Sequence, residues 1–162
     1  MLDSGAQAAV HRGDNPAIVA ILEEVCAATG MGFAALARVT ETRWIACQVL
    51  DRIEFGLDPG KELEIKTTIC NDIRKSGRAI VIDHVQADRD WCTHPVPILY
   101  GFQSYASFPV VLDDGSFFGT LCAIDPRPRN VTTAMAIATL EDCARRAGVI
   151  LSDGAGASAV GA

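Results

Sequence analysis

Residues 100–126, YGFQSYASFPVVLDDGSFFGTLCAIDP, hold two apolar runs separated by a polar tip. The runs are Tyr105–Leu112 and Phe117–Ile124, and the tip contains Asp113-Asp114-Gly115. Asp-Gly between runs rich in β-branched and aromatic residues is a strong hairpin signal. Because both runs are apolar almost throughout instead of alternating, both faces of the sheet should be covered. The stretch therefore predicts two antiparallel strands in the middle of a sheet, with helices on one face and a second cover on the other.

The length and composition of the chain indicate one domain. With 162 residues, 49% of them hydrophobic, the chain can bury a sizeable core. The net charge is -6 and the Lys and Arg residues are scattered, which disfavours binding to nucleic acid or to an anionic membrane surface. No apolar run approaches the roughly 18 residues of a membrane span, and residues 1–15 lack the features of a signal peptide. We therefore expect a cytoplasmic protein.

The cysteines are dispersed and include no C-x-x-C pair. Without an export signal they are expected to be reduced, and mostly to act as small core residues. Only Cys92 and His94 lie close together in the sequence, whereas a structural zinc site usually needs two local pairs of ligands. We therefore expect no metal site.

The segments before the hairpin give clear element boundaries. Asn15-Pro16 predicts the start of a helix over residues 16–29 that ends at Gly30. The apolar period then changes, and residues 32–39 and 43–50 predict a first hairpin. Residues 51–66 are predicted to form a loop with short extended pieces.

The second half of the chain predicts three more elements around the central hairpin. A short helix over residues 67–76 ends at Gly77, and residues 79–82 form a short buried strand. In residues 91–102 the two prolines restrict any helix to a short one after Pro97. Asn130 is predicted to cap a closing helix over residues 131–151.

This order of elements predicts an α+β fold, an α/β sandwich with a mainly antiparallel sheet. The opening and closing helices should share one face of the sheet. The short helix near Cys70 and the segment 91–102 should cover the other. The predicted single domain is 15–151, with a flexible tail at 1–14 and a low-complexity, disordered tail at 152–162.

Several short motifs resemble those of the GAF domain, a small-ligand module of bacterial and plant sensors. They are TIC (68–70), SGR (76–78), IVID (80–83), HPVP (94–97), YGFQSY (100–105), Pro109 and GTLCAID (119–125). The resemblance covers about residues 16–151 and is closest to GAF domains of sensor histidine kinases and phytochrome-like proteins. It implies a central antiparallel sheet of five or six strands, a ligand pocket on the face away from the terminal helices, and frequent dimerisation through those helices.

The candidate ligand-binding residues lie mostly in the predicted second cover. Aromatic rings there can line a pocket for a conjugated ligand, and the His94 imidazole, held between prolines, can hydrogen-bond a ligand. The alternatives are ordinary core packing for the aromatic residues and a capping role for His94. The set is Trp44, Cys70, Trp91, Cys92, His94, Tyr100, Phe102 and Ser104. We assign no catalytic residue.

Three functions remain open at this stage. The first is a sensory domain that binds a small molecule and signals in bacteria to a separate kinase or cyclase effector, since these 162 residues contain neither; the chain is a stand-alone protein or an excised module. The second is a photoreceptor domain with a tetrapyrrole (bilin), although the resemblance implies Cys followed directly by His, whereas this chain has Cys92-Thr93-His94. The third is a free methionine-R-sulfoxide reductase that uses Cys70 and Cys92 as thiols.

The closing helix also predicts a homodimer. Apolar or small residues occur nearly all round it between Ala134 and Ala147, more than one sheet-facing stripe requires. In a two-fold pairing Leu140 or Ile137 would meet its own counterpart near the axis. The alternative is an alanine-rich helix whose outward face is merely neutral.

Overall fold

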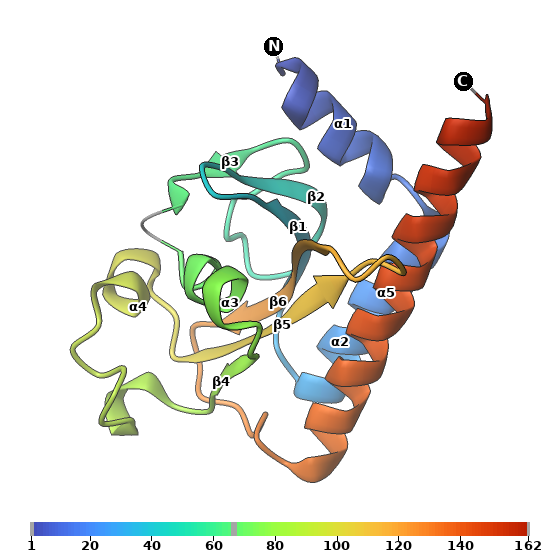
Figure 1. Cartoon of the computed structure of the whole chain (residues 1–162). Coiled ribbons are helices and arrows are strands. Elements are labelled where there is room, and N and C mark those ends of the chain that lie inside the picture. The colour runs from blue at the N-terminus through green and yellow to red at the C-terminus, as the bar shows by residue number, and fades with distance from the viewer. Residues whose placement is uncertain (1, 66–67, 162) are drawn as a thin grey trace.

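The computed structural model describes residues 2–65 and 68–161, with side chains as far as residue 153 (Figure 1). Its elements in chain order are α1 (Ser4–Gly13), α2 (Pro16–Thr29), β1 (Phe33–Val39), β2 (Trp44–Asp51), β3 (Glu62–Leu63), α3 (Cys70–Ser76), β4 (Ile80–Ile82), the 3-10 helix η2 (Val85–Ala87), α4 (Pro95–Tyr100), β5 (Ser104–Val111), β6 (Phe117–Asp125) and α5 (Ala134–Gly161).

The strands form one six-stranded sheet in the order β3-β2-β1-β6-β5-β4, and every neighbouring pair is antiparallel. The hairpin β5–β6 therefore lies inside the sheet, with β1 and β4 on its two sides, as the sequence predicts. At its tip Gly115 has a φ of 87°, a left-handed conformation that glycine adopts without strain. The Asp114 carboxylate accepts the backbone N–H of Ser116 at 2.8 Å and fixes the turn.

Both faces of the sheet are covered, which explains why the central strands are apolar throughout. Alternate residues of a strand point to opposite faces. One set, including Leu36, Phe108 and Leu121, packs under α1, α2 and α5. The other set, including Phe33 and Tyr105, faces α3, α4 and the loop after β2. Figure 1 shows these two covers on opposite sides of the sheet.

Helix α2 has the predicted bounds. The Asn15 side chain accepts the N–H of Ala17 at 2.8 Å, and Pro16 occupies the first turn, where its missing N–H is not needed. Gly30 ends the helix with a φ of 72°, and its N–H donates to the Cys26 carbonyl. The core contacts of α2 come from Ile18, Ile21, Leu22 and Val25.

The predicted flexible tail at 1–14 instead contains a packed helix. The Asp3 carboxylate accepts the N–H of Ala6 at the start of α1, and Ala6 and Ala9 are buried against β2. The helix lies so close to β2 that a Cβ on Gly13 would come within 2.4 Å of the Cys47 carbonyl oxygen. Small residues produce this contact, and they carry too little hydrophobic contrast to show a helical stripe in the sequence. At the other end of the chain α5 continues past residue 151 to Gly161.

Two other helix starts differ from the predictions. Helix α4 begins at Pro95, before Pro97, because a proline is tolerated in the first turn. Helix α5 begins at Ala134, and Asn130 does not cap it: Thr133 Oγ1 accepts the N–H of Ala136.

The apolar residues of α5 are largely used within one copy of the chain. Leu140 and Cys143 are fully buried in the core between α5, α2 and the sheet, so Leu140 is not available at a dimer axis. The exposed side of α5 carries Met135, Glu141 and Arg145. All of the cysteines are free, and only Cys92 is exposed. Among the described helices, none combines the length and the apolar character that crossing a bilayer requires.

Candidate functional site

An apolar cavity lies between the sheet and its second cover, on the face opposite α1, α2 and α5. Its volume is about 50 Å³. Its lining comes from β1, β2, β5 and β6 below and from α3, α4 and the loop after β2 above. The residues are Phe33, Trp44, Phe55, Leu57, Leu63, Thr68, Ile69, Cys70, Val96, Tyr100, Phe102, Tyr105, Cys122 and Ile124.

The cavity adjoins a cleft of about 500 Å³. The cleft runs between the loop 53–57 and the end of α4, and the two spaces share six lining residues. A molecule larger than the cavity can therefore extend from the sheet through the cleft toward solvent. The shared residues are Phe55, Leu57, Leu63, Tyr100, Phe102 and Ile124.

Asp51, the last residue of β2, holds the loop over the cavity. Its carboxylate accepts the backbone N–H groups of Ile53, Phe55 and Gly56 at 2.9 to 3.2 Å. Although partial burial opposes the charged form, these bonds lower the pKa of Asp51 below its usual value. The loop is thereby shaped to direct Phe55 at Phe33, with ring centroids 4.9 Å apart. Asp51 thus fixes one wall of the cavity.

The remaining aromatic wall comes from α4 and β5. The rings of Phe102 and Tyr105 are stacked at 5.2 Å, and the ring of Tyr100 lies 6.2 Å from that of Phe55. Such offset and tilted pairs leave flat ring faces available to an aromatic or conjugated ligand. The walls therefore favour a flat, largely apolar molecule.

A buried polar cluster lies beneath the cavity and centres on the thiol of Cys70, the first residue of α3. Its Sγ lies 3.1 Å from Thr120 Oγ1, 3.6 Å from the Tyr105 hydroxyl and 3.7 Å from Ser107 Oγ. All four side chains are buried. The neighbouring thiol of Cys122 lines the same cavity, and its Sγ lies 3.6 Å from the Ala35 carbonyl oxygen.

The hydrogen-bonding groups around Cys70 favour its thiolate. The Cys122 thiol has the largest effect, and together with Thr120, Tyr105 and Trp44 it outweighs burial and lowers the pKa of Cys70 to about 6. The same interaction, with burial, raises the pKa of Cys122 well above its usual value. Burial raises the pKa of Tyr105 in the same way, so the phenol stays a neutral donor. Cys70 is therefore the group of this cluster whose ionised form is favoured.

Trp44 contributes a buried donor that is only weakly paired with the Cys70 sulfur. The residue is only 3% exposed, and its Nε1 is buried and makes no close hydrogen bond among the described residues. It contributes to the low pKa of Cys70 only as the weakest of the neighbouring donors. Because an unpaired buried donor costs about 1 to 3 kcal/mol, an acceptor on a bound molecule would be stabilising here.

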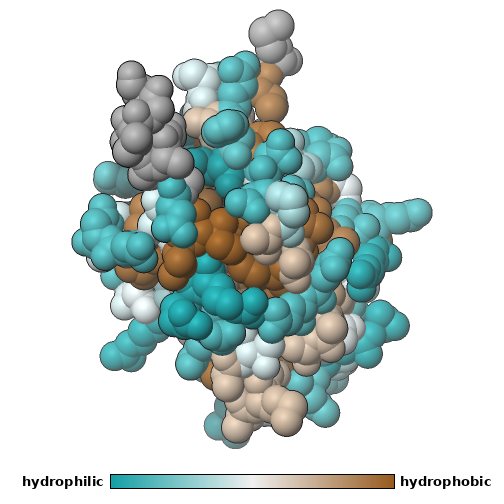
Figure 2. Space-filling view, turned by 90° about the vertical axis from the view of Figure 1, so that its right-hand side faces the viewer, coloured by the Kyte–Doolittle hydropathy of each residue, from teal (hydrophilic) through white to brown (hydrophobic). Residues whose placement is uncertain are grey.

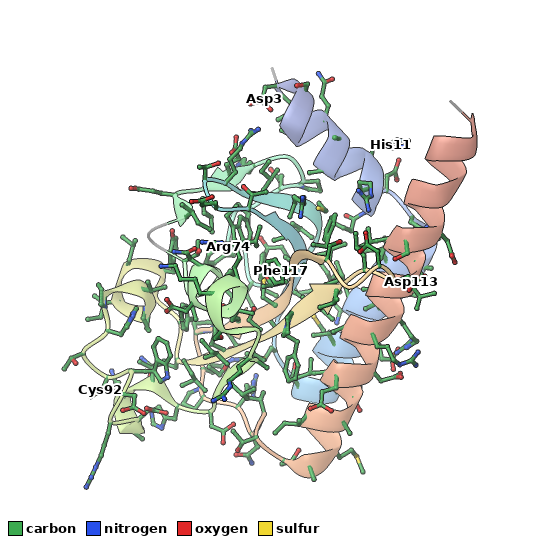
Figure 3. The ribbon with its side chains drawn as sticks, viewed as in Figure 1. Asp3, His11, Arg74, Cys92, Asp113 and Phe117 are labelled. Atoms are coloured by element: carbon green, nitrogen blue, oxygen red, sulfur yellow. The ribbon has the colours of Figure 1, made fainter. Side chains whose placement is uncertain are left out.

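Four of the eight predicted site residues line the cavity: Trp44, Cys70, Tyr100 and Phe102. The other four do not. Ser104 is buried outside it and donates to the Arg127 carbonyl, and Cys92 is exposed on the loop before α4, where Figure 3 shows it at the edge of the molecule. His94 Nδ1 accepts the N–H of Val96 at 3.2 Å and its ring packs 4.7 Å from that of Trp91, so it caps α4.

The sequence prediction missed several lining residues. Cys122 and Phe33 could have been found from the two-residue period of β6 and β1, once the face occupied by Tyr105 was known. Phe55 and Leu57 carried no such signal because they lie in a loop whose path is set by the Asp51 bonds. Among the described residues no group of three or more potential ligands is placed to hold a metal ion.

The chain belongs to the GAF domain family, whose model matches residues 17–151. No curated protein matches the sequence. The fold resembles the GAF domain region of a putative membrane protein from Geobacter sulfurreducens PCA, with a TM-score of 0.67 and 16% identity over 87% of this chain and 95% of that one.

Two further solved structures share the fold. The PixJ GAF domain of Thermosynechococcus elongatus, in its blue-light absorbing form, has a TM-score of 0.66 and 11% identity, covering 96% of this chain and 90% of that one. The GAF domain of a two-component sensor histidine kinase from Bacillus halodurans has a TM-score of 0.65 and 11% identity, covering 85% and 92%. At these identities the likeness concerns the fold.

Proposed function

We propose that this GAF domain is a sensory module whose cavity binds a flat, largely apolar small molecule that carries a hydrogen-bond acceptor. The supporting observation is the aromatic cavity itself, which contains the buried Trp44 N–H, a donor that makes no close hydrogen bond among the described residues and interacts only weakly with the Cys70 sulfur. A bound acceptor would satisfy this donor, and the rings of Phe55, Tyr100 and Phe102 would cover the apolar remainder.

Binding would act on the second cover of the sheet. The loop 53–57 and α4 form the mouth of the cavity, so a ligand that favours one arrangement of these segments shifts the population of the domain. The sheet connects them to α2 and α5, which would carry the difference to a separate kinase or cyclase effector. We propose the cytoplasm as the site of this action.

Native mass spectrometry of the freshly purified chain, followed by thermal unfolding with a panel of small aromatic alcohols and carboxylic acids, tests the proposal. Leu63→Trp should block the cavity mouth and abolish both retention and stabilisation, because Leu63 lines both the cavity and the cleft. Val111→Trp, at an exposed position away from the cavity, is the matched control. Binding that Leu63→Trp leaves unchanged, or no binding by any panel member, contradicts the proposal.

A covalently attached bilin does not fit these residues. Cys92 is exposed and lies outside the cavity, and His94 is engaged in capping α4. We therefore expect no visible absorption band that survives denaturation after co-expression with bilin synthesis, and such a band would contradict this inference.

A second candidate function is thiol chemistry, favoured by the presence of Cys70 and Cys122 in one cavity. The Cys70 thiolate would attack the sulfur of a sulfoxide, take over its oxygen with one proton as a sulfenic acid, and release the sulfide. The Cys122 thiol would then attack the sulfenic sulfur, releasing water and forming a disulfide that an external thiol reduces. Cys92, the partner predicted from the sequence, lies outside the cavity.

Turnover of free methionine sulfoxide with a thiol reductant decides between the two functions. The reductase requires that Cys70→Ser and Cys122→Ser both abolish turnover and that Cys92→Ser preserves it. If the wild-type chain shows no turnover, the reductase function is excluded and the sensory function remains.

We also propose a homodimer through α2 and α5, on different residues from those first expected. Figure 2 shows that the face carrying α5 has a band of hydrophobic residues bordered by hydrophilic ones. On α5, Met135 is 80% exposed and Val149 is 40% exposed. Sedimentation equilibrium at micromolar concentration, with Met135→Glu and Val149→Glu for comparison, tests the dimer, and a wild-type monomer would contradict it.

A further inference from the structure

A second cavity lies on the opposite face of the sheet, beneath α1. It has a volume of about 220 Å³ and is separate from the aromatic cavity. Three of its nine lining residues are arginines, and each comes from a different segment: Arg12 from α1, Arg38 from β1 and Arg43 from the turn between β1 and β2. The other lining residues are Gly5, Ala8, Ala9, Thr40, Ile45 and Phe118.

Only one of these arginines is neutralised. Arg43 contacts the carboxylates of Asp3 and Glu62 at 2.8 Å each. Arg12 and Arg38 have no carboxylate within 4 Å among the described residues, and the side chains outside that set include no Asp or Glu. Both nearby carboxylates are therefore bound to Arg43, and none is left for the other two guanidinium groups.

The charges of Arg12 and Arg38 meet over one ring. Their guanidinium carbons lie 4.9 Å and 5.0 Å from the centroid of Phe118, which is buried beneath them. A ring face attracts a cation but carries no net negative charge, so the two like charges remain uncompensated. Burial, and next the charge of Arg12, lower the pKa of Arg38. This arrangement is electrostatically unfavourable unless an anion joins it.

The donors of the two arginines are also incompletely used. Arg38 Nη1 donates to the carbonyls of Phe118 at 2.5 Å and Phe117 at 3.4 Å, and Arg12 Nη2 donates to the Leu151 carbonyl at 3.2 Å. Arg12 Nε is buried and has no acceptor among the described residues. Each guanidinium presents five N–H donors, so several remain for a ligand.

We infer that this cavity binds a small oxyanion of the phosphate or carboxylate class between Arg12 and Arg38. The planar guanidinium fork matches the paired oxygens of such groups, and partial burial strengthens the charge-assisted hydrogen bonds. The oxyanion accepts from the free N–H groups of the two guanidiniums and supplies the missing negative charge. A neutral ligand would satisfy the donors but not the charge.

The site links the two ends of the chain. Arg12 belongs to α1 and also donates to the Leu151 carbonyl in α5, whereas Arg38 belongs to the sheet. An anion shared by the two arginines therefore fixes α1 on the sheet next to α5. This effect is independent of the aromatic cavity, which lies on the other face.

Inorganic phosphate and acetate are the probes, titrated separately into the full-length chain at constant ionic strength and pH. We expect a saturable rise in Tm and a matching calorimetric binding isotherm with at least one of them, because a ligand that binds only the folded state stabilises it. Stabilisation by one probe alone assigns the class. If neither phosphate nor acetate shows saturable binding, the inference is overturned. This holds also if an acidic group of another protein binds at the site.

The variants locate the site. Arg12→Gln and Arg38→Gln should each weaken binding by about tenfold or more, since each removes a charge-assisted contact. Arg12→Lys and Arg38→Lys keep the charge and should fold, but they lose the planar pair of guanidinium N–H donors. Arg89→Gln removes one exposed charge on the loop before α4 and should bind as the wild type does. Binding that is unchanged in the Arg12 and Arg38 variants overturns the inference.

Discussion

The Cys70 sulfur lies 3.1 Å from the Thr120 hydroxyl oxygen, and this contact joins the first residue of α3 to the centre of the sheet. Thr120 is fully buried and pairs with Ala37 on one side and Pro109 on the other. A threonine in this apolar strand would leave its hydroxyl unsatisfied without the thiol. The contact therefore explains both the polar residue in β6 and the position of α3 over the cavity.

We predict that the stability of the fold depends on pH through Cys70. Its pKa is lowered from 9.0 to about 6, so between these values the unfolded chain binds more protons than the folded one and stability rises with pH. The Cys122 pKa is raised, chiefly by the interaction with Cys70, so its contribution is complete below pH 9 and is lost above it. Urea unfolding at a series of pH values measures the profile.

Cys70→Ala should flatten the rise in stability between about pH 6 and pH 9 and lower the free energy of unfolding by about 1 to 3 kcal/mol, because the hydroxyls around it lose a partner. Cys92→Ala, at the exposed thiol, is the control and should keep the wild-type profile. An unchanged rise in Cys70→Ala would show that the thiolate does not form.

Asp51→Ala should loosen the wall of the aromatic cavity. The variant removes the acceptor of three backbone N–H groups in the loop 53–57, so Phe55 and Leu57 lose their fixed position. We expect a loss of about 1 to 2 kcal/mol in stability and faster amide hydrogen exchange confined to this loop. Asp58→Ala is the control, since this exposed carboxylate only contacts Lys61 at 3.6 Å. Equal protection of the loop in both variants would contradict the role of Asp51.

A third prediction concerns the start of α5. Asp83, after β4, accepts the backbone N–H groups of Val131 at 2.6 Å and Thr132 at 2.9 Å, and it also contacts the Thr132 hydroxyl. Asp83→Ala should therefore cost about 1 to 2 kcal/mol. Asn130→Ala, which removes the cap expected from the sequence, should change stability by less than about 0.5 kcal/mol because Asn130 is exposed. Chemical denaturation measures both losses, and a larger loss in Asn130→Ala than in Asp83→Ala would show that Asn130 is the cap.

The elements that could be predicted are those whose information is local. The Asn15-Pro16 start and Gly30 end of α2, and the Asp-Gly tip of the β5–β6 hairpin, are fixed by backbone geometry within a few residues. The GAF family was indicated by short local motifs such as GTLCAID (119–125), and the side of the sheet that holds the cavity was implied by that resemblance. Half of the predicted site residues line the cavity, among them Cys70 and Tyr100, because the short helix and α4 were expected to cover that face.

The remaining features depend on contacts between distant segments. Helix α1 packs through small residues whose burial is decided by β2, and the segment that leads into α5 is held by Asp83, about 50 residues before it. That Arg12 and Arg38 lie together without a carboxylate partner likewise becomes visible only when α1 lies on the sheet. A sequence pattern cannot reveal such relationships unless the pairing of the segments is known.

The last prediction concerns Asp125, the buried carboxylate at the end of β6. Its oxygens accept the N–H of Gly32 at 2.9 Å and the backbone N–H of Arg127 at 2.8 Å, and Arg127 Nε donates at 3.1 Å. Burial opposes the charged form, but the bonds from Arg127 and Gly32 prevail and lower the pKa below 3.8. Asp125 thus ties the start of β1 to the segment that follows β6.

Because the folded-state pKa is the lower one, this stabilisation is complete above the unfolded pKa of about 3.9 and is lost as the pH falls through the folded value. Asp125→Asn should lower the free energy of unfolding at neutral pH by about 2 to 3 kcal/mol, since the amide keeps one acceptor but not the charge. The variant should also lose less stability than the wild type between pH 5 and pH 3, measured by urea unfolding. Asp90→Asn, at an exposed carboxylate, should follow the wild type at every pH, and an acid profile of Asp125→Asn as steep as that of the wild type would show that this carboxylate is not a source of the acid sensitivity.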